Sequence, residues 1–189
     1  MIDYKKYGFE NPKKYFSPGR VNLIGEHVDY HGGSVFPTAI NLGTYGFVQH
    51  RDDFEFHFIS TSFEEVGEIV VNVENLKYNE DNDWANYMIG MIDLLVSKGF
   101  ILNHGLDILI HGDLPNGAGL SSSASIEVLM GVILNDTFDL GIKMIDLVQF
   151  AQKVENDYVG VNCGIMDQFA VGMSKKETAM LLNTKTLEY

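Results

Sequence analysis

The segment SPGRVNLIGEHVDYHGGS, residues 17–34, holds an unusual group of chemically active side chains. Arg20, Glu26, His27 and Asp29 lie close together in it and are interleaved with apolar residues. Carboxylates and imidazoles accept hydrogen bonds from hydroxyl groups, and a guanidinium binds carboxylates or phosphates. The segment is too charged for an ordinary buried strand and too apolar for a surface loop. Its charges therefore need a chemical explanation.

A second feature is the glycine- and serine-rich stretch DLPNGAGLSSSASIEV, residues 113–128. Gly117 and Gly119 permit a positive φ or a close backbone approach, and Ser121, Ser122 and Ser123 lie where a helix is expected to begin. A helix N-terminus after such a turn presents unpaired N–H groups, which suit phosphate. No lysine follows the glycines, so this is not a Walker A loop, and Ser122 replaces the last glycine of G-x-G-x-x-G. An ordinary loop with a serine cap is an equally good interpretation.

Two carboxylates in the second half of the chain stand in apolar surroundings. Glu155 falls on the apolar face of a predicted helix, where an ionised group is unfavourable unless it meets a cation. By itself it is best interpreted as reaching water at the edge of that face, and the alternative is a magnesium site with a serine hydroxyl and phosphate oxygens. Asp167 is the only charge in GVNCGIMDQFAVG, residues 160–172. By default it caps the next helix, and the alternative is a poorly solvated base for proton abstraction.

Apolar periodicity predicts the elements that position these residues. Residues 44–53, 54–61 and 67–76 are rich in β-branched and aromatic side chains and predict strands, with Phe54, Phe56 and Phe58 alternating on a half-buried one. After a polar loop over 77–83, a helix begins at Trp84, with Asp83 as its N-cap and Gly99 as its end. The pattern further predicts a strand over 105–115, helices from the serine run to about Thr137 and over 142–158, and a strand from about Thr178. Strands and helices without regular alternation indicate an α+β domain.

The composition limits the function. The 189 residues suffice for one domain, or one and part of another, and 46% of them are hydrophobic. The net charge of -13 disfavours binding to nucleic acid or to anionic membranes, so a nucleotide would have to be held by backbone N–H groups and a metal. Cys163 is the only cysteine, and the sequence shows neither a signal-type nor a membrane-spanning apolar run. These observations predict a soluble, cytoplasmic protein.

Three of these segments together resemble the galactokinase branch of the GHMP small-molecule kinases. GRVNLIGEHVDY (19–30) resembles the galactokinase signature, and LPNGAGLSSSAS (114–125) resembles the phosphate loop of the superfamily. VEND followed by GVNCGIMDQFA resembles the segment that carries the catalytic aspartate, and the similarity extends from Ser17 to Tyr189. The resemblance implies a GHMP N-terminal domain over residues 1–189, with a mixed sheet packed against helices in a ribosomal-protein-like βαβ fold.

The resemblance also implies an activity and residue roles. The activity is ATP-dependent phosphorylation of the C1 hydroxyl of D-galactose, with Mg²⁺ as cofactor. Asp167 would be the catalytic base, and Arg20 beside it would stabilise its charge and that of the transferring phosphoryl group. The implied ligand contacts are Glu26, His27, Val28 and Asp29 for the sugar; Gly117, Ala118, Gly119, Leu120, Ser121, Ser122 and Ser123 for the ATP phosphates; Ser60, or nearly as well Ser62, for the nucleotide; and Ser123 with Glu155 for the metal.

The chain differs from that family by ending before the C-terminal domain. We therefore expect the N-terminal half of a galactokinase, nearly inactive by itself, which self-associates through an exposed apolar face. Val21, Leu23 and Ile24 would anchor the first motif to the core. Other functions remain open, namely a kinase for N-acetylgalactosamine or another sugar, or a catalytically silent regulator that binds galactose and ATP. The intact GLSSSAS, with Arg20 and Asp167 present, disfavours the regulator.

Overall fold

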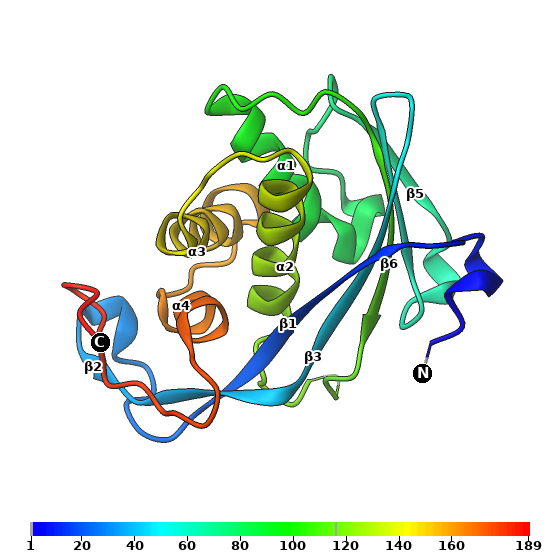
Figure 1. The fold of residues 1–189 in the computed structure, drawn as a ribbon. Coiled ribbons are helices and arrows are strands. Elements are labelled where there is room, and N and C mark those ends of the chain that lie inside the picture. The colour runs from blue at the N-terminus through cyan, green and yellow to red at the C-terminus, as the bar shows by residue number, and fades with distance from the viewer. Residues whose placement is uncertain (1, 116) are drawn as a thin grey trace.

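The computed structural model describes residues 2–115 and 117–189. In this part of the chain a five-stranded sheet runs in the order β1-β3-β6-β4-β5, and the α-helices cover one of its faces (Figure 1). The strands are β1 (Lys13–Asn22), β3 (Pro37–His50), β4 (Glu55–Ser60), β5 (Ile69–Asn72) and β6 (Leu106–Gly112). Neighbouring strands are antiparallel except β4 and β6, which are parallel. The predicted α+β class with a mixed sheet is therefore confirmed.

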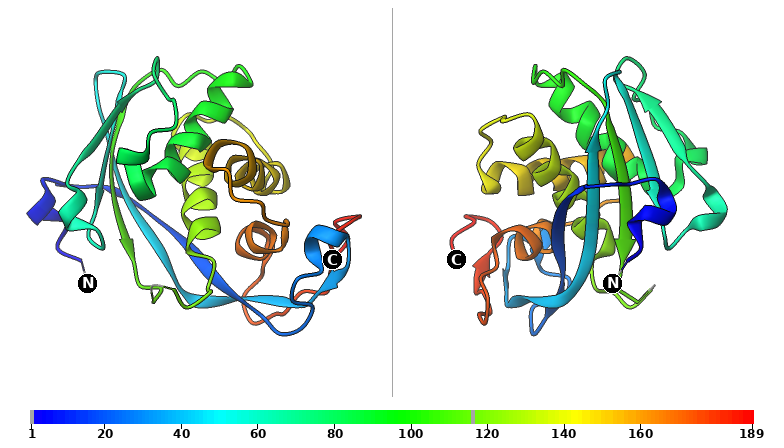
Figure 2. Two further views of the ribbon diagram at one scale, coloured as in Figure 1. Left: turned by 180° about the vertical axis from the view of Figure 1, so that it is seen from behind. Right: turned by 45° about the vertical axis from the view of Figure 1, so that its right-hand side comes forward.

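The helices are α1 (Asn86–Ser97), α2 (Ser122–Thr137), α3 (Met144–Lys153), which continues into a π-helical turn (Val154–Val159), and α4 (Met166–Met173). A second, two-stranded sheet pairs β2 (Ser34–Val35) with β7 (Leu182–Asn183). Figure 2 shows how this pairing holds the C-terminal segment beside β2. None of the described helices is long and apolar enough to cross a membrane.

The main core lies between the sheet and the helices, and α2 contacts β1, β3 and the other three α-helices. The largest fully buried side chains include Phe56 and Phe58 from β4, Ile108 from β6, Ile92 from α1 and Leu129 from α2. The predicted alternation therefore holds for the first two. Phe54 lies before the start of β4 and is 52% exposed, so it does not belong to that pattern.

Several strand boundaries differ from the prediction. No strand was predicted over residues 13–22, because its charges obscure the period, yet this segment is the edge strand β1 paired with β3. The pairing with β1 also explains why β3 begins at Pro37 rather than near Thr44. The predicted C-terminal strand from Thr178 shrinks to Leu182–Asn183, since its partner β2 offers only two residues.

The start of the first helix also differs. Residues Glu80–Ala85 form a 3₁₀ helix instead of a polar loop, and Asp83 has φ 40° and ψ -122° rather than capping α1. The buried side-chain amide of Asn86 donates to the carbonyls of Asn79 and Asp83, at 2.7 and 3.2 Å, and so holds this turn in place. Gly99, with φ 87°, follows the end of α1 as predicted.

His57 on β4 makes the stability of the domain depend on pH. Its ring nitrogens lie 2.9 Å from a carboxylate oxygen of Glu68 and 3.2 Å from one of Glu55. Burial acts to lower the pKa of His57, but the hydrogen bonds to both carboxylates outweigh it and raise the pKa. A raised folded-state pKa stabilises the fold fully below the unfolded value of about 6.5, and this stabilisation is lost as the pH rises through the folded value.

We expect His57→Gln to lower the free energy of unfolding by about 0.5–1 kcal/mol at low pH, as for other partly exposed ion pairs, and by less at high pH. Urea unfolding at pH 5.5 and pH 8.5 measures this difference. His31→Gln, at an exposed position, is the control. Equal losses for His57→Gln at both pH values would contradict the pairing.

Candidate functional site

An irregularity in β1 positions Arg20. The register between β1 and β3 shifts between Pro18 and Arg20, as in a β-bulge. Gly19 is required there, because a Cβ would lie 2.8 Å from the carbonyl oxygen of Leu120 and 2.6 Å from a methyl carbon of Leu114. The backbone N–H of Arg20 donates to the same Leu120 carbonyl at 3.1 Å. The bulge therefore joins the edge of the sheet to the glycine-serine loop.

The side chain of Arg20 binds Asp167 with two parallel hydrogen bonds. Nε and Nη2 donate to the two carboxylate oxygens, each at 2.8 Å, and Nη1 donates to the carbonyl of Gly119 at 2.6 Å. Ser121 Oγ donates to Oδ2 of Asp167 at 2.5 Å. Asp167 lies in the first turn of α4 but is not its N-cap, which is Ile165, so the capping interpretation is wrong. With 29% of its side chain exposed, the carboxylate is held by its partners and still accessible.

The glycine-serine loop enters α2 through left-handed backbone conformations. Gly117 and Gly119 have φ of 69° and 66°, and Ser121 has φ 59° and ψ 52°. Ser121 occupies the N-cap position without a side-chain cap, because its hydroxyl is bound to Asp167. The first N–H groups of α2 are thus left for an anion. The loop lines a cavity of about 250 Å³ together with Arg20 and Asp167.

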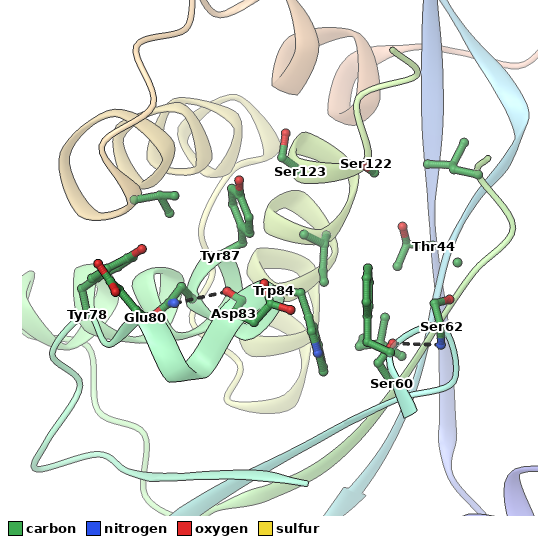
Figure 3. Close-up of a pocket in the computed structure, with 17 residues that line it drawn as sticks. Thr44, Ser60, Ser62, Tyr78, Glu80, Asp83, Trp84, Tyr87, Ser122 and Ser123 are labelled. Atoms are coloured by element: carbon green, nitrogen blue, oxygen red, sulfur yellow. Dashed lines mark hydrogen bonds between the residues drawn. The ribbon is translucent and has the colours of Figure 1, made fainter. Parts of the chain in front are cut away.

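A larger pocket of about 450 Å³ lies beside the start of α2 (Figure 3). Ser122 and Ser123 border both cavities, so the two are adjacent. The pocket has an aromatic wall, in which the rings of Phe63 and Trp84 are stacked with an interplanar angle of 14° and Tyr87 stands near the serines. Such a wall suits a flat, partly apolar group.

The sequence did not reveal this aromatic wall. Helical spacing placed Trp84 on the apolar side of a helix, and such spacing cannot distinguish a core residue from a pocket residue. Ser60 and Ser62, the two alternatives predicted to contact the nucleotide, both line the pocket. Ser60 is buried and its Oγ accepts from the backbone N–H of Ser62, whereas Ser62 is exposed. Ser62 is therefore the better placed of the two to meet a ligand.

Glu155 lies in the π-helical turn after α3 and is only 6% exposed. The interpretation that it reaches water at the edge of the helix is therefore wrong. Burial raises the pKa of Glu155, and the hydroxyl of Ser123 is the largest influence that opposes this rise. The structure thus brings Ser123 and Glu155 together. Oε2 of Glu155 also accepts from Gln168 and, at 3.5 Å, from the thiol of Cys163.

These two residues fit a magnesium ion only if a ligand completes the site. Within residues 2–115 and 117–189, no three His, Cys, Asp or Glu side chains are grouped to hold a metal. Ser123 and Glu155 offer oxygen atoms, which Mg²⁺ prefers, and Mg²⁺ usually takes further oxygens from phosphates and water. Among the described residues Glu155 has no basic partner, and a bound cation would compensate its buried charge.

The other charged residues of the first motif lie on the turn that follows β1. Gly25 and His27 have φ of 98° and 60°, and the side chains of Glu26 and His27 are exposed. Asp29 is half-buried and reaches α4, where Oδ2 accepts from the backbone N–H of Met166 at 3.4 Å. A Cβ on Gly164 would lie 2.0 Å from that oxygen, so a larger residue there would displace the Asp29 carboxylate. Asp29 therefore lies close to the start of α4, which also carries Asp167.

The apolar residues of this motif behave differently from the prediction. Val28 packs beside a small buried cluster that includes Val35 and Phe169, so its side chain faces inward. Leu23 and Ile24 are 58% and 71% exposed and do not anchor the motif to the core. The motif is instead held by backbone pairing, since Leu23 and Phe36 bond through an N–H and a carbonyl.

Comparison with known proteins extends this description. Residues 4–50 match the galactokinase galactose-binding signature, and residues 86–175 match the GHMP kinases N terminal domain. The chain is 53% identical over 183 residues to a galactokinase of Enterococcus faecalis, covering 97% of this chain and 47% of that protein. It is 54% identical to a galactokinase of Clostridium acetobutylicum, covering 100% of this chain and 49% of that protein. The chain thus spans about half the length of the relatives it matches.

Solved structures agree with the sequence matches. The crystal structure of Lactococcus lactis galactokinase complexed with galactose aligns with a TM-score of 0.93 at 43% identity, covering 98% of this chain and 48% of that one. Methanococcus jannaschii mevalonate kinase aligns with a TM-score of 0.78 at 18% identity, covering 92% of this chain and 54% of that one. The second likeness shows a shared fold only.

Proposed function

We propose that this chain, which belongs to the galactokinase family of GHMP kinases, carries the phosphoryl-transfer site of an enzyme that phosphorylates the C1 hydroxyl of D-galactose with ATP. The observation that carries the proposal is the contact of Arg20 with both Asp167 and the glycine-serine loop. It joins a carboxylate able to accept a proton to a loop suited to phosphate. The proposed location of the enzyme is the cytoplasm, where ATP is available.

The chemistry assigned to this contact is direct in-line transfer. The reacting sugar hydroxyl lies against Asp167, its proton passes to the carboxylate, its oxygen bonds to the γ-phosphorus, and ADP leaves. Arg20 orients Asp167 and stabilises negative charge on the transferring group. The remaining sugar hydroxyls donate to Glu26, His27 and Asp29, which distinguishes sugars that differ at one carbon. Val28 is the fourth residue assigned to the sugar and contributes backbone only, since its side chain faces inward.

The nucleotide is assigned to the two adjacent cavities. Backbone N–H groups of residues 117–123 hold the phosphates at the start of α2. The base occupies the aromatic pocket near Trp84, with Ser62 at its rim. Ser123 and Glu155 would hold Mg²⁺, which when bound neutralises phosphate charge.

The proposal is tested by sugar phosphorylation in the natural polypeptide that carries this sequence. ATP turnover is measured with D-galactose, N-acetylgalactosamine and D-glucose in parallel. We expect D-galactose to be the preferred acceptor. If galactose is inert while another sugar turns over, the substrate assignment is wrong, and binding of galactose and ATP without any turnover would identify a regulator.

Trp84→Ala should weaken the binding of ADP about tenfold or more, because stacking of a base on an aromatic ring contributes roughly 1–3 kcal/mol. Isothermal titration calorimetry with ADP measures the change. Phe54→Ala removes an exposed aromatic ring outside the pocket and should leave the affinity unchanged. Equal affinities of wild type and Trp84→Ala would exclude the base from this pocket.

Self-association of the 189-residue chain is part of the proposal. Leu23 and Ile24 are both mostly exposed, and neighbouring exposed apolar side chains favour association. Light scattering at rising concentration should show a molar mass above that of the 21.2 kDa monomer, and replacing both residues with serine should reduce it. A monomer at high concentration would contradict this part of the proposal.

A further inference from the structure

One buried side-chain amide connects three segments of the proposed site. These segments carry the phosphate-binding loop, the metal ligand Glu155 and the catalytic base Asp167. Gln168 is 0% exposed and directly follows Asp167 in α4. Its Nε2 donates to Oε2 of Glu155, in the π-helical turn after α3, and to Oε2 of Glu127, in α2, at 2.5 and 3.2 Å. The same α2 begins at the glycine-serine loop. A single side chain thus links three parts of the site.

The hydrogen bonds around Gln168 require one more donor. Oε1 of Glu127 and Oε1 of Gln168 are both buried and have no partner among the described residues. An ionised Glu127 would leave both of these oxygens without a donor, whereas a protonated carboxyl group carries an O–H. Burial, followed by the nearby charge of Glu155, raises the pKa of Glu127 to about 10. Burial therefore favours the neutral form of the Glu127 carboxyl group.

The amide of Gln168 supports the carboxylate of Glu155 directly. An amide stabilises a neighbouring carboxylate only when its N–H points at the carboxylate, and here the N–H does so. The thiol of Cys163 donates to the same oxygen, Oε2, at 3.5 Å. With Oε2 occupied by two donors, the carboxylate of Glu155 is fixed in orientation. Partners of this kind, outside the metal ligands, commonly set metal affinity.

We infer that Gln168 is a positioning residue for the metal site: its amide fixes the carboxylate of Glu155, and Glu127 holds the amide. This inference rests on the proposed function, because it gives Glu155 the role of binding the metal of ATP. It assigns a role to Glu127 and Gln168, neither of which lines the two cavities described above. It also explains why a glutamate is buried in α2 without a cation among the described residues.

The test separates metal binding from nucleotide binding. ADP affinity is measured by calorimetry with Mn²⁺ as the probe metal and again with EDTA, and the ratio of the two gives the gain due to metal. Gln168→Met, which keeps the size but removes the amide, should reduce this gain about tenfold or more and leave the affinity in EDTA unchanged. Glu127→Gln, which keeps both a donor and an acceptor, should retain the gain within about twofold.

The outcomes distinguish this inference from the proposed function. If wild type gains affinity with Mn²⁺ and Gln168→Met gains equally, the inference is wrong and the proposed function stands. If wild type itself gains nothing from Mn²⁺, the metal role of Glu155 fails and the inference fails with it. Thermal melting checks that each variant folds. If Gln168→Met does not fold, Gln168→Asn decides, since its shorter amide should also lose the gain.

Discussion

Asp167→Asn should lower the rate of galactose phosphorylation about a thousandfold, within the range typical for loss of a general base. The asparagine has nearly the same shape as aspartate, so packing around the start of α4 is kept. It cannot accept the proton of the sugar hydroxyl. One of the two hydrogen bonds from Arg20 is also lost, because only one oxygen remains. The rate is measured as kcat with saturating ATP and galactose in the natural polypeptide.

Binding measurements show whether this loss belongs to the chemical step. Asp167→Asn should bind ADP at least as tightly as wild type, because it removes a negative charge beside the phosphate cavity and leaves the aromatic pocket unchanged. Asp157→Asn is the matched control, since Asp157 is exposed and pairs with Lys153 on the surface. Its kcat should equal that of wild type. A less than tenfold loss of kcat in Asp167→Asn would exclude this carboxylate as the base.

The sequence predicted the local backbone features of the site better than the burial of its side chains. Glycines at 117 and 119 indicated a tight turn, and the structure gives both a positive φ. The resemblance implied that Arg20 lies beside Asp167, and the two side chains are in contact. The positive φ follows from local residue types, whereas the contact between β1 and α4 was available only from the family resemblance.

Residue patterns alone did not predict the features that depend on packing between distant elements. Glu127 lies in α2, and only its contact with Gln168 of α4 reveals a buried acid. Leu23 and Ile24 look like core residues in the sequence, yet the turn after β1 leaves them exposed. Apolar periodicity reports which face of an element is hydrophobic, and it does not report what covers that face.

Arg20→Met should have the second large effect, on activity and stability together. It removes the cation beside Asp167 and three donated hydrogen bonds, two to that carboxylate and one to the carbonyl of Gly119. Breaking a largely buried ion pair costs about 3–5 kcal/mol, because one charge stays behind. Since Asp167 is 29% exposed, the lower end of that range is expected. The rate of phosphorylation should fall about a hundredfold or more as charge stabilisation is lost.

A double-mutant cycle separates the two contributions of Arg20. In Arg20→Met/Asp167→Asn the unpaired carboxylate is gone, so the double variant should unfold at a higher urea concentration than Arg20→Met alone. Its activity should not recover, because both the base and the cation are missing. Arg51→Met is the control, since Arg51 pairs with Asp53 and Asp107 outside the proposed site. It should lose stability and keep its rate. Simple additivity of the two changes in stability would mean that Arg20 and Asp167 are not energetically coupled.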